Sequence, residues 1–164
     1  METDTFVQTH KGDGLKRKSF ARHLPTAGRI VMGFIFFASG TFGLLTLLGV
    51  VPQPSTPMPA GAAAFAGALA KTGYMMPLIS GTQAIVGILL LSNRFVPLAL
   101  AVIAPMIINI LAFHAFLAPS GAGPGVVVAA LELYLAWAYR KEFRPMLTMR
   151  AEPVSGANDT SRVG

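Results

Sequence analysis

The sequence contains no cysteine and little charge, and each scarcity excludes a class of protein. Without a thiol, this chain alone cannot exchange disulfides, attack as a thiolate, or hold zinc or an iron–sulfur cluster through cysteine. Only 12% of its residues are charged, against about 25% in ordinary soluble domains. Between Arg29 and Arg140 the only formal charges are Lys71, Arg94 and Glu132. Such a segment cannot cover itself with polar side chains, so its solvent must be lipid.

The sequence also lacks the motifs of common enzymes. No phosphate-binding loop, nucleophile elbow or nucleotide-binding glycine motif lies on a plausible strand. The net charge of +6 could suit nucleic acid, but the basic residues flank apolar runs instead of forming a recognition element. We therefore expect no nucleic-acid partner and no resident cofactor, and the sequence favours a protein that is not an enzyme on its own.

What the sequence does contain is four long apolar stretches, which predict an all-α transmembrane four-helix bundle. A helix rises about 1.5 Å per residue, so about 20 residues cross a hydrocarbon core of roughly 30 Å. One domain, residues 25–145, holds the four predicted spans, at residues 27–51, 74–91, 95–117 and 124–143. A basic cytoplasmic segment, residues 1–24, precedes this domain, and a tail expected to be disordered, residues 146–164, follows it. The first span is too long for a signal-peptide core, so we interpret it as an uncleaved anchor.

The connection between the first two spans carries a further short helix. Residues 52–59 include four prolines and must form a loop. Residues 60–71 are rich in alanine and end in Lys71, with Gly73 placed to terminate a helix. Twelve residues are too few to cross the membrane. We expect an interfacial or re-entrant helix on the outer side.

The distribution of basic residues predicts the orientation. Twelve of the thirteen Lys and Arg residues fall on the side of the N-terminus, the 92–94 turn and the C-terminus. Cytoplasmic loops of membrane proteins carry an excess of Lys and Arg. Both termini are therefore expected in the cytoplasm. Arg29, at the inner end of the first span, is expected to extend to the lipid headgroups.

Three polar side chains are predicted at similar depth inside the membrane. Counting inward from the outer helix ends places Gln83, Asn109 and Glu132 about 12–13 Å deep. Asn109 follows Pro105 by four residues, and a proline inside a helix leaves a backbone carbonyl without its usual partner. We expect Pro105 to bend the third span, Asn109 to face the other helices, and the three side chains to form one polar layer.

Glu132 and His114 each have a functional and a structural interpretation. A carboxyl group at this depth should be protonated, paired or hydrated, so Glu132 could handle protons, bind a ligand or make a structural hydrogen bond. Small residues on its helical face, Gly125, Ala129 and Ala136, indicate that it faces protein. His114 lies near the outer surface, where a single histidine is more often structural than functional. No His/Glu pair has the spacing of helical metal ligands, so we expect no metal site.

Several segments resemble the DoxX family of bacterial membrane proteins. They are RIVMGFIFFASG, the TGY before the second span, GILLL-x-x-RFVPLAL, P-x-x-x-N-x-x-x-x-H and LELYLAWAYRKEFRPML, which together cover about residues 27–147. The resemblance implies a four-helix protein of the bacterial inner (cytoplasmic) membrane, in a family named after a quinol-linked oxidase subunit. Many members carry Gly-x-x-Lys where this chain has Gly40 and Gly43, and a glutamate where it has Gln83. These departures weaken the transfer of any charge-dependent activity.

Two functions of different class remain open. The first is a non-catalytic membrane subunit or scaffold of a redox or oxidative-stress assembly, with a redox protein as partner. The alternative is an oxidoreductase subunit that binds quinone or is linked to protons, or a small-solute carrier, with its site at Gln83, Asn109 and Glu132. A quinone site needs hydrogen-bonding groups in an apolar cleft. A partner would have to supply the electrons, because the sequence has no motif for haem, flavin or a cluster. A homo-oligomer is open in either case.

Overall fold

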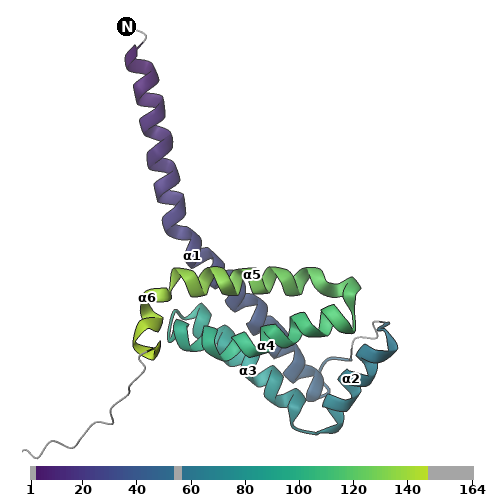
Figure 1. The fold of residues 1–164 in the computed structure, drawn as a ribbon. Coiled ribbons are helices and arrows are strands. Elements are labelled where there is room, and N and C mark those ends of the chain that lie inside the picture. The colour runs from purple at the N-terminus through teal and green to yellow at the C-terminus, as the bar shows by residue number, and fades with distance from the viewer. Residues whose placement is uncertain (1–2, 54–56, 148–164) are drawn as a thin grey trace, which may run out of the picture.

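The computed structural model describes residues 3–53 and 57–147, with side chains for 23–53 and 57–145. The described part is helical and contains no strand, as predicted. Its elements are α1 (Thr3–Leu47), α2 (Ala60–Lys71), α3 (Met75–Leu91), α4 (Val96–Phe116), η1 (Pro119–Gly121), α5 (Ala122–Ala138), α6 (Arg140–Phe143) and η2 (Arg144–Leu147). The N-terminal part of α1 extends beyond the other helices (Figure 1).

Three helical segments in the described chain are long and apolar enough to cross a membrane. They are His23–Leu47, Val96–Phe116 and Pro119–Ala138. The helices Ala60–Lys71 and Met75–Leu91 meet at an angle of 91° and provide a fourth span if the pair is counted as one. The chain is therefore an integral membrane protein. The predicted short helix at 60–71 has the bounds of α2.

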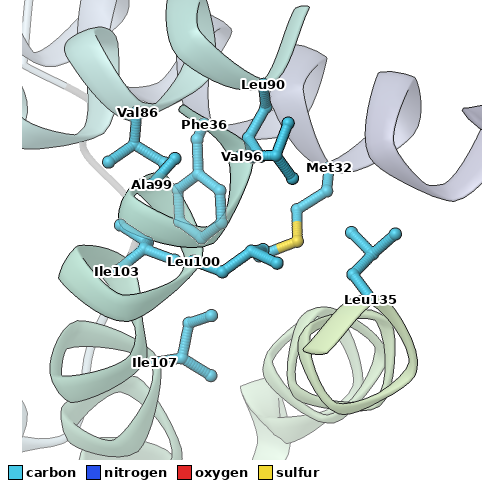
Figure 2. Close-up of a cluster of buried hydrophobic side chains, with 10 residues drawn as sticks. All are labelled: Met32, Phe36, Val86, Leu90, Val96, Ala99, Leu100, Ile103, Ile107 and Leu135. Atoms are coloured by element: carbon cyan, nitrogen blue, oxygen red, sulfur yellow. The ribbon is translucent and has the colours of Figure 1, made fainter. Parts of the chain in front are cut away.

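Four helices share one apolar core. α1 packs against α3 and α5, and α4 packs against the same two helices. The core residues that meet between them are Met32, Phe36, Val86, Leu90, Val96, Ala99, Leu100, Ile103, Ile107 and Leu135 (Figure 2). Half of this cluster comes from α4, so α4 contributes more residues to the core than any other helix.

α1 ends earlier than the predicted first span. The helix stops at Leu47 instead of residue 51 because Gly49 adopts the left-handed conformation, with a φ of +74°. The Val50 amide then donates to the Leu45 carbonyl at 2.9 Å, and the Gly49 amide donates to Thr46 at 3.1 Å. This is the hydrogen-bonding pattern of a Schellman motif, in which glycine ends a helix without steric cost. In the other direction, α1 continues through Pro25 into the predicted N-terminal segment.

The last predicted span is two helices instead of one. α5 starts at Ala122 and ends at Ala138, and Tyr139, with φ −93° and ψ 12°, separates it from α6. Beside this break, the Arg140 guanidinium donates to the Trp137 carbonyl at 2.9 Å and lies 4.6 Å from the centre of the Trp137 ring. Arg140 thus satisfies a carbonyl at the end of α5 and stacks on the aromatic ring there. The prediction that one helix continues to residue 143 was wrong.

Candidate functional site

Gln83 of α3 and Asn109 of α4 line the same groove. The groove has a volume of about 480 Å³ and lies between the N-terminal half of α3 and the C-terminal half of α4. Apart from these amides and Thr82, its walls are apolar: Met75, Leu78, Ile79, Val102, Pro105, Met106 and Ile110. Neither amide side chain forms a hydrogen bond within the described part of the chain. The groove therefore offers free donors and acceptors in apolar surroundings, the usual composition of a small-molecule site.

Asn109 also borders a second cavity, beneath α2. This cavity measures about 240 Å³ and lies between Phe65 of α2 and the C-terminal turns of α4. The Phe65 and Phe113 rings pack there with their centres 5.8 Å apart. α2 thus covers the side of α4 next to Asn109. The amide of Asn109 is accessible from both the α3–α4 groove and the space beneath α2.

Asn109 does not face the core, and the expectation that it turns inward is wrong. Its side chain is exposed, whereas Ile103 and Ile107 are fully buried. The cause is the rotation of the helix: Asn109 follows Ile107 by two residues, about 200° around α4. Counting residues gives the depth of a side chain but not its direction. Pro105, one turn earlier, lies on the same exposed side and inside a helix that continues to Phe116.

Glu132 lies apart from the two amides, so the predicted layer is not a single cluster. Its side chain is only 8% exposed and lines a cavity of about 180 Å³ between α4 and α5. The α4 residues at this cavity are Ala104, Ile107, Ile108 and Leu111, a different face from the one that carries Asn109. The Glu132 Oε2 atom is buried and has no hydrogen-bond partner among the described residues. Gln83 and Asn109 are brought together, and Glu132 is not.

His114 has a local structural partner. Its Nδ1 atom lies 2.8 Å from the Ile110 carbonyl oxygen, one turn earlier in α4. A carbonyl can only accept, so Nδ1 carries the proton in this contact. The ring also packs edge-on against Phe113 and next to Gly121, where an added Cβ would lie 3.0 Å from the ring. The position of His114 therefore suits the structural interpretation.

Arg29 is a buried residue whose role the sequence analysis missed. It is 6% exposed, and its Nη1 atom donates to the carbonyl of Leu90 and, at 3.3 Å, to that of Leu91. These carbonyls end α3, where the helix dipole is negative. The guanidinium therefore does not extend to the headgroups as expected, because a closer set of acceptors is available. An arginine inside an apolar span needs acceptors, so the sequence indicates that Arg29 has partners but not which carbonyls they are.

No acidic or histidine cluster suitable for a metal occurs in the described chain. Nowhere in the described residues do three or more His, Cys, Asp or Glu side chains lie together. None of the other residues that line the Glu132 cavity is titratable, and the hydrogen bond of His114 is to a backbone carbonyl. Two features combine a cavity with polar side chains inside the predicted spans, the α3–α4 groove and the Glu132 cavity.

Comparisons with protein-family models, with curated proteins and with solved structures give no match. The helices establish the membrane class. The resemblance to the DoxX family stays a prediction.

Proposed function

We propose that this chain is a DoxX-like four-span protein of the bacterial inner membrane that acts as a non-catalytic subunit or scaffold of a redox or oxidative-stress assembly. The observation that supports the membrane bundle is the outer surface of the core helices. Large apolar side chains point outward from each of them, among them Phe34, Ile85, Ile108 and Leu133. A surface of this kind is stable against lipid and not against water.

In this proposal α1, α3, α4 and α5 form the bundle, and α2 is a re-entrant or interfacial helix at the outer end. The α3–α4 turn carries Arg94, and the α5–α6 junction carries Arg140 and Lys141, whereas α2 ends in Lys71. The excess of positive charge at the turn and the junction supports a cytoplasmic location for both termini. α2 contacts the opposite end of α4 through the Phe65–Phe113 pair, which supports its outer position.

The subunit role is tested by purifying the tagged full chain from native membranes in a mild detergent. We expect a redox protein to co-purify at a fixed ratio to the chain. The same ratio should be recovered with the Glu142→Gln control, which alters an exposed residue of α6. A chain that runs alone in several mild detergents and carries oxidoreductase activity itself would contradict the proposal.

The α3–α4 groove supports a second candidate function, binding of a quinone or another apolar molecule with carbonyl groups. Gln83 and Asn109 approach from opposite walls and can donate to two carbonyl oxygens in apolar surroundings. Its volume of about 480 Å³ is within the usual range for ligand sites, roughly 300–1,000 Å³. Access from the bilayer suits a ligand that is dissolved in lipid.

Native mass spectrometry and lipid extraction test this second function. We expect the purified chain to retain a quinone, and Asn109→Leu or Gln83→Leu to lose it. Gln53→Leu is the matched control, because Gln53 is an exposed amide that lines neither the groove nor the cavity beneath α2. Equal retention in all variants, or no quinone in the unaltered chain, would contradict a quinone site at these amides.

A further inference from the structure

The Glu132 cavity combines a buried, unpartnered carboxyl oxygen with adjacent empty space. Glu132 is 92% buried, and its Oε2 atom has no hydrogen-bond partner in the part of the chain that the structure describes. The cavity beside it, about 180 Å³, is otherwise lined by aliphatic side chains: Ala104, Ile107, Ile108, Leu111, Ala129 and Leu133. A buried polar atom without a hydrogen-bond partner is unusual in proteins and calls for an explanation.

No cation of the described chain occupies this cavity. On α1, Arg29 follows Gly28, which packs against α5. The guanidinium of Arg29 is directed to the Leu90 and Leu91 carbonyls. From α4, His114 is bonded to Ile110, and on α5 itself Tyr134 packs beside Gly28 of α1. None of these titratable groups lines the cavity. Glu132 thus lies among aliphatic side chains at the wall of the cavity.

An ionised carboxylate in these surroundings is stable only when a cation neutralises it, and otherwise the group holds a proton. A metal ion would require several oxygen or nitrogen ligands, whereas this cavity offers one carboxyl group. A small organic ammonium ion needs only the single charge. The alkyl or aryl substituents of such an ion would contact Ile107, Ile108 and Leu133. These contacts would replace those that the ion makes with lipid chains in the bilayer.

We propose that Glu132 and the α4–α5 cavity bind a small lipophilic ammonium cation in exchange for the carboxyl proton. No covalent bond to carbon changes and no electron is transferred. The O–H bond of the acid breaks, the proton leaves to solvent, and the cation pairs with the carboxylate. One proton is released for each cation bound. The site lies on another face of α4 from the quinone candidate and depends only on the membrane location of the chain.

Calorimetry on the full chain in phosphatidylcholine nanodiscs tests the exchange, with benzyltrimethylammonium as the probe and empty nanodiscs as the blank. Titrations in two buffers of different ionisation enthalpy count the protons released. We expect saturable binding, one proton released per cation, and an affinity that rises about tenfold per pH unit while the acid is protonated. No saturable binding, or binding without proton release, would overturn the proposal.

Three variants and a neutral probe separate the site from general charge effects. Glu132→Gln should abolish binding, whereas Glu142→Gln, which removes an exposed carboxylate on α6, should leave it unchanged. Ala129→Leu keeps the acid but fills the cavity, and we expect at least a tenfold weaker affinity. The uncharged isostere 2,2-dimethylpropylbenzene should release no proton. Unchanged binding in both Glu132→Gln and Ala129→Leu would refute the site and leave the topology of the chain unaffected.

Discussion

Gly87 of α3 lies against the backbone of Phe37 of α1, so closely that a Cβ atom at residue 87 would overlap the Phe37 amide nitrogen and Cα. A matching contact occurs one helix turn away, where Gly40 of α1 meets the backbone of Ala84. The two glycines, one from each helix, set the closest approach of α1 and α3. Small residues have this role in membrane helices, because close packing replaces the hydrophobic effect as the force between helices.

Gly87→Ala should destabilise the protein by about 1–3 kcal/mol, the usual range for overpacking. The added methyl group would force α3 away from α1, since its nearest neighbours are backbone atoms that cannot rotate aside. Gly81→Ala is the matched control: its Cβ meets nothing within 4 Å, and alanine favours helix. Thermal unfolding in detergent measures both. Equal stability of the two variants would show that α1 and α3 are not in close contact.

Arg29→Met should lower the free energy of unfolding by about 1–3 kcal/mol, because it removes the guanidinium donor at the end of α3. The Leu90 carbonyl keeps the Asn93 amide as a donor, whereas the Leu91 carbonyl loses the donor that the described structure gives it. Methionine preserves much of the apolar stem of arginine, so the loss of stability measures the contribution of the guanidinium group. The control is Arg94→Met, which removes an exposed cation from the adjacent turn and should have little effect. If the two substitutions act equally, the burial of Arg29 has no energetic consequence.

Asn109→Leu should leave stability unchanged or raise it slightly in the absence of ligand. The side chain is exposed and has no hydrogen bond among the described residues, so leucine removes an unsatisfied amide from apolar surroundings. An inward-facing asparagine would instead lose about 0.6–2 kcal/mol, the contribution of a hydrogen bond between membrane helices. Chemical unfolding of the ligand-free protein distinguishes the two orientations, and a loss in that range would contradict the exposed position.

Glu132→Gln should keep the fold and change the unfolding midpoint little. The Oε2 atom has no partner to lose in the described structure, and glutamine has nearly the same volume. By comparison, Leu135→Ala, one turn away in the core, should cost about 2–5 kcal/mol. Circular dichroism and thermal unfolding compare the two variants. Unfolding of Glu132→Gln would mean that the carboxylate is ionised and paired with a cation outside the described residues.

Much of the helical organisation follows from local sequence signals, whereas the candidate site depends on features that those signals do not contain. The prolines before α2 and Gly73 after it predict its bounds because both residue types act on the backbone itself. Gly49 gives the same kind of signal for the end of α1, so the end of this helix near residue 47 was predictable from the sequence. Depth along a helix can be counted, so Gln83, Asn109 and Glu132 were placed at one level.

Rotation about the helix axis was not predictable in the same way. It is set by which residues of α4 join the core, and α4 is apolar on nearly every side, so its sequence does not mark the buried face. The separation of Asn109 from Glu132 follows from this rotation. The acceptors of Arg29 were hidden for a related reason, since the carbonyls of Leu90 and Leu91 have no sequence signature.

Labelling of single cysteines in intact cells tests the four-span topology most directly, because the native chain has no cysteine to give background. Ser120→Cys lies in η1 at one end of the helices, and Asn93→Cys lies in the α3–α4 turn at the other. A membrane-impermeant maleimide should label residue 120 in intact cells and residue 93 only after the membrane is permeabilised. Labelling of both residues in intact cells, or of residue 93 alone, would contradict the four-span protein with cytoplasmic termini.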